Sequence, residues 1–293
     1  GGHVEIIVID NSSYDGSAAM VRERFPAVKL IENDSNMGFA IGVNNGLKAA
    51  TGDFILLLNP DTVIEEKTLS VLIAYMNSHS EVGICGPKIL NADGSLQLAC
   101  KRSFPMPWVA LPKLLGLSRL FPRGKWTGRY NLTYLDPDQH HSVEAVSGSF
   151  MIIRREVLEA VGELDERFFM FGEDLDYCYR TIQAGYEIHY VPDTQIIHYK
   201  GESVKSAPYD SVGWFYDAMD LFVNKHFSKT ASLLTRNALK TGITARKAST
   251  LLSSLLVQVL PVILDVCMVG FAFLIAIPTR FGSLTPAIDA YFP

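Results

Sequence analysis

The chain has 293 residues, 48% of them hydrophobic, so it can bury a sizeable core, which excludes a disordered protein and a disulfide-stapled mini-domain. Its 26 basic and 31 acidic residues give a net charge of −5, which does not indicate a nucleic-acid-binding surface. The charge is uneven, because residues 1–220 hold 19 cations and 29 acids, whereas residues 221–293 hold seven cations and two acids.

Short apolar runs alternate with helical stretches over the first 60 residues. The pattern predicts strands at 4–9, 28–31 and 54–58, and helices at 18–24 and 39–50. Because these strands are almost fully apolar, we expect an α/β fold with a parallel sheet covered on both faces. Polar residues follow two of the strands, at 10–13 and 59–61. Ligands of such sheets bind beyond the carboxyl ends of the strands, so we expect both clusters to line one crevice.

The middle of the chain changes character. Residues 103–141 are rich in Pro, Gly, Arg and aromatic residues, which predicts a long irregular loop, and loops of this length are usually functional or mobile. Regular structure then returns, with a strand at 143–153, helices at 155–161 and 177–184, and a strand at 187–191.

The end of the chain carries a long apolar stretch, residues 251–277, which at about 1.5 Å per residue can cross a hydrocarbon layer of roughly 30 Å. Four residues would gather on one face of a helix, namely Ser254, Gln258, Pro261 and Asp265. A tilted or kinked span, a helix lying in the membrane interface and a helix buried against a soluble core all remain open. The cations that precede this stretch favour binding to membrane lipids and a body at the cytoplasmic face of the membrane.

Three acids, Glu173, Asp174 and Asp176, crowd into four positions, which is costly unless a cation, an arginine or a raised pKa relieves the repulsion. The alternative is a solvated helix start, where acids favour the helix dipole. Asp61 follows a strand and a proline. Such an aspartate can be a turn residue, or its carboxylate can be an oxygen ligand of a divalent cation. His198 ends an apolar run, where a core residue and a metal ligand both fit the sequence.

Three other enzyme classes do not fit the motifs. A haloacid-type phosphatase needs an Asp-x-Asp at a strand end, where this chain has Asn59 instead of the nucleophilic carboxylate. The residues after the first strand are not the G-x-G-x-x-G of a dinucleotide dehydrogenase, and a Walker loop is absent.

Five motifs in order resemble the family 2 glycosyltransferases of the GT-A fold, over about residues 4–203. They read EIIVIDNSSYDGS, NMGFAIGVNNGL, GDFILLLNPD, VSGSFMIIRREVLEAVGELDERFFMFGEDLDYCYRTIQAGY and IIHYKGES. The NPD form, the GEDLDYCYR stretch and the tail are most similar to bacterial rhamnosyltransferase-like members of polysaccharide assembly. The resemblance implies a sandwich-like α/β domain that transfers a sugar from a nucleotide diphosphate donor, with a membrane-associated helical tail.

The resemblance also implies the donor-binding residues. Asp10 corresponds to the family acid that hydrogen-bonds the nucleobase, and Asn11 and Ser12 shape the same turn. Asn36 and Gly38 correspond to the loop that faces the base and ribose.

The metal site is implied in the same way. Asn59-Pro60-Asp61 stands at the DxD position, so Asp61 is expected to coordinate Mg²⁺ or Mn²⁺, and Asn59 to face the donor with one negative charge fewer than the usual acid. His198 matches a histidine that completes the metal site in some relatives. Lys200 is expected to close over the diphosphate.

The acceptor side centres on Asp174, which matches the general base of an inverting transfer. Glu173 and Asp176 are expected to orient the acceptor or to pair with Arg180, which lies four positions after Asp176 on a helix. The resemblance implies rhamnose from dTDP-rhamnose as the sugar and a lipid-linked saccharide as the acceptor.

These expectations divide the chain into a nucleotide-sugar-binding half at 1–102, an acceptor and catalytic half at 103–220, and a basic membrane-associated tail at 221–293. Relatives normally carry another strand and helix before residue 4, so we expect a sheet with one strand fewer. A catalytically impaired sugar-nucleotide-binding or membrane scaffold protein is therefore the alternative function, and a membrane-tethered phosphatase or nucleotidyltransferase is a third.

Overall fold

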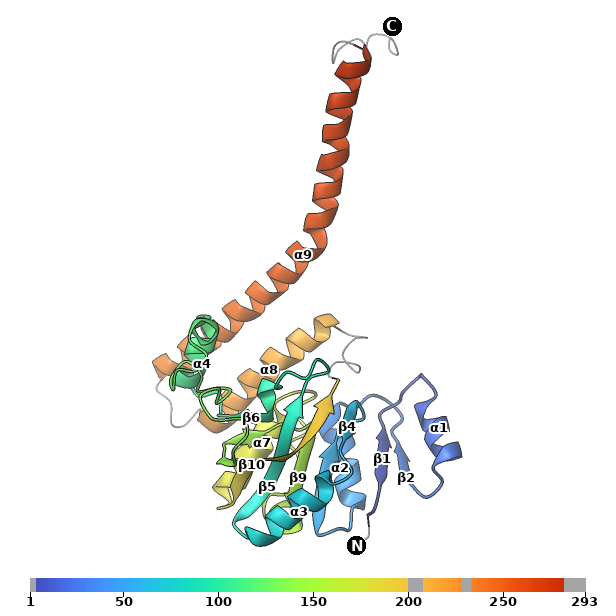
Figure 1. Cartoon of the computed structure of the whole chain (residues 1–293), viewed down its shortest axis with the longest axis vertical. Helices are drawn as coiled ribbons and strands as arrows, with labels where there is room; N and C mark the ends of the chain where they lie inside the picture. The colour runs from blue at the N-terminus through green and yellow to red at the C-terminus, as the bar shows by residue number, and fades with distance from the viewer. Residues whose placement is uncertain (1–3, 200–207, 228–232, 282–293) are drawn as a thin grey trace. The chain divides into compact units, whose positions relative to one another are not determined.

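The computed structural model describes residues 4–199, 208–227 and 233–281. Its first part alternates strand and helix as predicted (Figure 1). The elements are β1 (Ile7–Asp10), α1 (Ser17–Arg24), β2 (Lys29–Glu32), α2 (Phe39–Ala49), β3 (Phe54–Leu58), β4 (Thr62–Ile64), α3 (Thr68–Ser78) and β5 (Val82–Leu90). β1 and β2 form a parallel pair of their own, and α2 packs against β1.

The main sheet has six strands. Five follow the order β3-β9-β5-β10-β4, and β7 (His141–Ser142) also pairs with β10. β10 (Glu187–His198) runs parallel to β5, but β9 (Phe150–Arg154) runs antiparallel to both of its neighbours, β3 and β5. The prediction of a parallel sheet is therefore wrong, and the sheet is mixed. The chain reaches β9 through the long segment after β5 and not through the helical crossover that makes neighbouring strands parallel.

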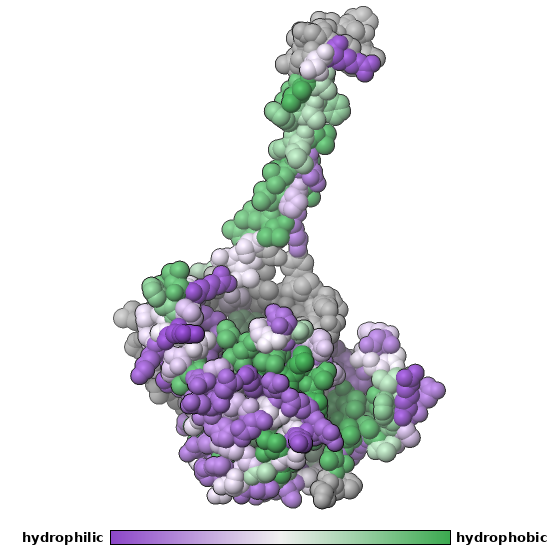
Figure 2. Space-filling model, in the orientation of Figure 1, coloured by the Kyte–Doolittle hydropathy of each residue, from purple (hydrophilic) through white to green (hydrophobic). Residues whose placement is uncertain are grey.

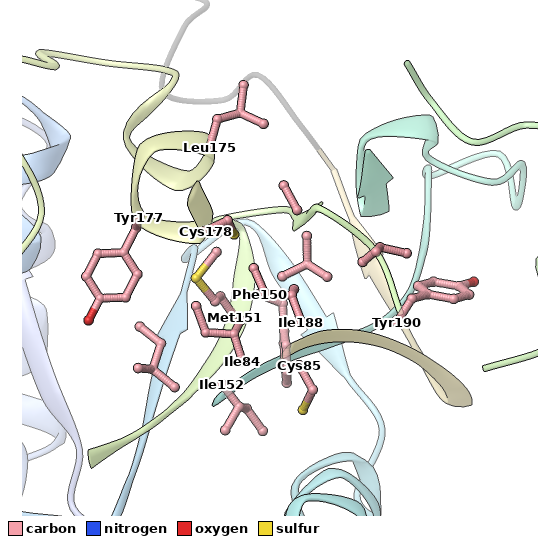
Figure 3. Packing of buried hydrophobic residues seen from close by; sticks show 14 of the residues in the cluster. Ile84, Cys85, Phe150, Met151, Ile152, Leu175, Tyr177, Cys178, Ile188 and Tyr190 are labelled. Carbon is pink, nitrogen blue, oxygen red and sulfur yellow. The ribbon is translucent and has the colours of Figure 1, made fainter. Parts of the chain in front are cut away.

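The sheet is covered on both faces, as predicted. Successive side chains of a strand point to opposite faces, and the four residues from Phe150 to Ile153 are all at most 1% exposed. Figure 3 shows Phe150, Met151 and Ile152 close to side chains of β5 and β10. Leu175 and Cys178 of α7 (Glu173–Gln183) belong to the same buried cluster. α7 thus begins directly above the core, and its first turn is held in a fixed position over the sheet.

The segment predicted to be irregular contains two short helices. α4 (Pro107–Leu114) begins with a proline, which suits the first turn of a helix, and Gly116 with φ +76° separates it from α5 (Leu117–Leu120). The predicted strand at 143–153 is broken into β8 (Ala145–Val146) and β9 by a turn at residues 147–149. The remaining elements are η1 (Leu98–Cys100), β6 (Lys101–Arg102), which pairs with β8, and α6 (Arg155–Val161).

The chain divides into two compact units, residues 1–243 and 244–293. α8 (Pro208–Phe227) belongs to the first unit, and its Phe222 and Phe227 are buried in the core. The predicted boundary after residue 220 therefore falls inside α8. α9 (Leu233–Phe281) includes the stretch Ala248–Ile277, whose length and mean hydropathy of 2.5 would allow it to cross a membrane.

Candidate functional site

The turn after β1 is bound to the loop before α2. Asp10 is 9% exposed, and its carboxylate accepts a hydrogen bond from the backbone N–H of Ser13 at 3.1 Å. The Asn11 side-chain amide donates to Asn36 Oδ1 at 3.0 Å and to the carbonyl oxygen of Gly38 at 3.1 Å. Four of the five residues predicted for base and ribose binding are thus joined by hydrogen bonds or lie next to each other in one turn.

Gly38 fixes where this loop lies. Its φ is +88°, and a Cβ atom there would lie 2.6 Å from the carbonyl oxygen of Phe169. The N–H of Phe39 donates to that same oxygen at 2.7 Å. Ser12, the fifth predicted donor residue, also has a left-handed backbone with φ +64°, which is uncommon for a residue with a side chain. The loop that carries Gly38 is therefore attached directly to the segment that leads into α7.

Asp61, just before β4, meets His198, the last residue of β10. β4 pairs antiparallel with β10, which sets His198 opposite Thr62. His198 Nε2 lies 3.2 Å from Asp61 Oδ1, and His198 Nδ1 hydrogen-bonds to Gln97 Oε1 at 2.9 Å. Asp61 Oδ1 is buried and has no hydrogen-bond partner among the described residues. The structure thus brings together the two residues predicted as metal ligands.

This pair fits a hard divalent cation. Two ligands held at right angles about 2.1 Å from a Mg²⁺ ion lie about 3 Å apart, close to the separation of the two atoms. A buried carboxylate oxygen that accepts no hydrogen bond, with an imidazole nitrogen 3.2 Å away, is also the kind of atom that a cation stabilises. Within the part of the chain that the structure describes, no group of three or more His, Cys, Asp or Glu side chains could hold a metal. Asp61 and His198 could supply two of the ligands of such a cation.

Asp174 is held by a buried arginine that the sequence analysis did not identify. Arg102 Nη2 lies 2.5 Å from Asp174 Oδ2, and the two side chains are only 12% and 13% exposed. Burial opposes the charge of Arg102, but the nearby carboxylate of Asp174 outweighs it, so the pKa of Arg102 is raised. Asp174 Oδ1 accepts one hydrogen bond, from the N–H of Leu175 at 2.7 Å. The sequence gives one indication of such a partner: Glu173, Asp174 and Asp176 repel one another, so a cation is expected near them.

A single turn joins Asp174 to the NPD segment. The N–H of Gly148 donates to Asp174 Oδ2 at 3.0 Å, and the N–H of Asn59 donates to the carbonyl oxygen of Ser149 at 2.9 Å. A Cβ atom on Gly148 would lie 3.1 Å from the Cβ atom of Asp174, so the turn fits closely against α7. The predicted base and the predicted metal segment, more than 100 residues apart in sequence, are therefore held by two adjacent residues of one turn.

Glu173 is a buried carboxyl beside Asp174. It is 7% exposed, and its Oε2 has no hydrogen-bond partner among the described residues. Burial, followed by the negative charge of Asp174, raises the pKa of Glu173 to about 8. Glu173 is therefore mostly protonated at neutral pH, and Asp174 does not face a second negative charge.

Asp176 connects α7 to α8. It is completely buried, and it pairs with Arg180 Nε at 2.9 Å, Lys225 Nζ at 2.6 Å and His226 Nε2 at 2.7 Å. Burial would raise the pKa of Asp176, but hydrogen bonds from His226 and Lys225 and the charge of Arg180 lower it. Of the two roles predicted for Asp176, the pairing with Arg180 is present, and a side chain so buried has no surface that faces an acceptor. Lys200 lies outside the described residues.

Comparison with known proteins identifies the family of this chain. Residues 2–216 match the family described as Glycosyltransferase like family 2. N-acetylglucosaminyl-diphospho-decaprenol L-rhamnosyltransferase of Mycobacterium tuberculosis is 28% identical over 216 residues, which are 70% of this chain and 69% of the relative. Rhamnosyltransferase WbbL of Escherichia coli is 27% identical over 210 residues, which are 67% of this chain and 73% of the relative.

A mannosyltransferase from Pyrobaculum calidifontis, solved in complex with GDP-Man and Mn²⁺, aligns with 92% of this chain and 71% of its own at 16% identity, with a TM-score of 0.49. The family match and the mixed α/β architecture confirm the GT-A fold class that the motifs indicated. The matched region covers well over half of the chain. The chain therefore belongs to glycosyltransferase family 2, and it is a sugar-transferring enzyme of glycan synthesis.

Proposed function

We propose that the chain transfers rhamnose from dTDP-rhamnose to a lipid-linked saccharide at the cytoplasmic face of the cell membrane, with inversion at the anomeric carbon. The observation that carries the chemistry is the turn at residues 147–149, which holds Asp174 and the NPD segment together. The donor and acceptor are suggested by the relatives named as rhamnosyltransferases, one of them for a decaprenol-linked sugar.

Asp174 is the general base in this proposal. Its Oδ2 is occupied by Arg102 and Gly148. Among the described residues Oδ1 accepts only the N–H of Leu175, which leaves a lone pair for an acceptor hydroxyl. Arg102 acts as a positioning residue, because its short contact aims the carboxylate and fixes which oxygen is available. A base in this role contributes about 10²- to 10⁴-fold to the rate.

The donor lies on the other side of the same turn. Asp10, Asn11 and Ser12 would contact the nucleobase, and Asn36 and Gly38 the base and ribose. Asp61 and His198 would hold Mg²⁺ or Mn²⁺, which supplies positive charge for the leaving diphosphate. Asn59 would face the donor with a neutral amide.

The membrane part of the proposal is supported by α9. Its stretch Ala248–Ile277 is long and apolar enough to cross a bilayer, and a lipid-linked acceptor is confined to that bilayer. The cations at 229–247, which precede this stretch in the sequence, favour the cytoplasmic side.

The test is transfer by the full chain in a membrane lipid extract with radiolabelled dTDP-rhamnose and Mn²⁺. We expect labelled lipid, its loss in EDTA and a loss of at least 100-fold in Asp174→Asn. The matched control is Asp53→Asn, an exposed acid at the start of β3, which should retain full transfer. Equal transfer by Asp174→Asn would refute the base, transfer only from another nucleotide sugar would refute the donor, and nucleotide binding without any transfer would favour the binding-protein alternative.

A further inference from the structure

The segment of residues 107–129, which carries α4 and α5, exposes an unusual amount of apolar side chain. Six large apolar residues are between 45% and 70% exposed, namely Trp108, Leu111, Leu115, Leu120, Phe121 and Trp126. The surfaces of soluble proteins rarely expose so many large apolar side chains together, and such a patch usually marks a contact with another protein or a membrane. The patch belongs to the first unit of the chain and is separate in sequence from α9.

The same segment is strongly cationic. Five cations lie between residues 103 and 135, namely Lys113, Arg119, Arg123, Lys125 and Arg129, and this stretch contains no acid. The other residues of 1–220 hold 14 cations and 29 acids, so the segment is a basic island on an acidic body. Figure 2 shows hydrophobic and hydrophilic surface side by side over α4.

Beside the segment lies a groove of about 660 Å³. Its walls are mostly apolar and include Phe104, Met106, Trp108 and Trp126. Glu144, the one acid in its lining, pairs with Arg129 at 3.1 Å, so its negative charge is compensated. A negatively charged apolar partner therefore meets no unpaired acid at this surface.

We propose that residues 107–129 dock onto the surface of an anionic lipid bilayer and form a membrane contact of the catalytic body in addition to α9. Exposed Trp and Leu beside Lys and Arg are the pattern of segments that lie in the bilayer interface, where indole rings sit at headgroup level and cations attract anionic lipids. Charge alone fits both an anionic bilayer and the acidic body of a second copy of the chain. The exposed Trp and Leu side chains select the bilayer, because its interface receives cations and apolar side chains together, whereas an acidic protein surface matches only the cations. The proposal does not depend on which sugar is transferred.

The chain contains three tryptophans, and two of them, Trp108 and Trp126, lie in the segment. The third, Trp214, lies in α8 with its ring 5.0 Å from that of Phe169. The full chain with Trp214→Phe, reconstituted in vesicles of brominated phosphatidylcholine with 30% phosphatidylglycerol, reports only on the segment. We expect at least half of its fluorescence to be quenched, and less than a tenth in the matched variant Trp108→Phe/Trp126→Phe, which retains Trp214.

Removing cations from residues 107–129 should distinguish docking of this segment on the bilayer from tethering of the chain by α9 alone. Arg119→Gln/Arg123→Gln/Lys125→Gln in the Trp214→Phe background should lower the quenching at least twofold, as should vesicles without phosphatidylglycerol. The control Arg24→Gln/Lys29→Gln/Lys67→Gln removes three exposed cations elsewhere and should leave quenching unchanged. Absent quenching, equal quenching of Trp214, or an equal effect of both triple variants would overturn the proposal. Shielding of the two tryptophans that rises with protein concentration, without quenching, would point instead to self-association.

Discussion

Substitution of Glu173 by glutamine tests the electrostatics at the start of α7. The pKa of Glu173 is about 8 in the folded chain, against an ordinary value of 4.5. Between these pH values the folded chain binds one proton more than the unfolded chain, so stability falls as pH rises, by about 1.4 kcal/mol per pH unit. The loss accumulates over the window to roughly 5 kcal/mol near pH 8, and glutamine, which does not ionise, avoids it.

Thermal unfolding of the full chain in detergent, followed by tryptophan fluorescence from pH 5 to pH 9, measures this loss. Glu173→Gln and the unmodified chain should have similar Tm values near pH 5, and by pH 8 the variant should unfold roughly 10 °C higher. The exposed Glu156→Gln, on α6, is the matched control and should follow the unmodified chain at every pH. A constant difference between Glu173→Gln and the unmodified chain across the pH range would refute the reasoning.

Two further substitutions test how the site is held. Asp176→Asn removes the buried carboxylate that Arg180 and Lys225 share, so Arg180 loses its acidic partner and Lys225 keeps only Asp165. We expect the free energy of unfolding to drop by about 3–5 kcal/mol in urea titrations, and a drop below 1 kcal/mol would show that the pairs are unimportant. Gly38→Ala places a Cβ atom 2.6 Å from the carbonyl oxygen of Phe169, so it should weaken binding of dTDP at least tenfold in calorimetry. Gly94 also has a positive φ, but a Cβ atom there would have no neighbour within 4 Å, so Gly94→Ala should leave binding unchanged. Equal effects of the two substitutions would contradict the steric argument.

Local features of the fold could be predicted from the sequence. The first strands and helices were located because apolar runs, glycines and prolines act on their immediate neighbours in the chain. The direction of β9 could not be predicted, because its pairing with β3 and β5 depends on contacts between distant segments. The helices α4 and α5 were also missed, because their Pro and Gly content is typical of loops.

The site shows the same division. Asp61, His198 and Asp174 could be identified because the motifs that carry them are short and ordered along the chain. Arg102 could not, because it is 72 residues before Asp174 and meets it only when β6 pairs with β8. The positive charge of Lys225 counts toward the basic tail in the sequence, whereas in the fold Lys225 pairs with Asp176, as does His226. Charge composition gives the sign of a segment but does not identify its partners.

The turn at residues 147–149 makes its contacts to Asn59 and Asp174 through backbone atoms on its own side. An inserted or deleted residue in the turn would therefore shift the two halves of the proposed reaction centre relative to each other, and a side chain at position 148 would press on Asp174.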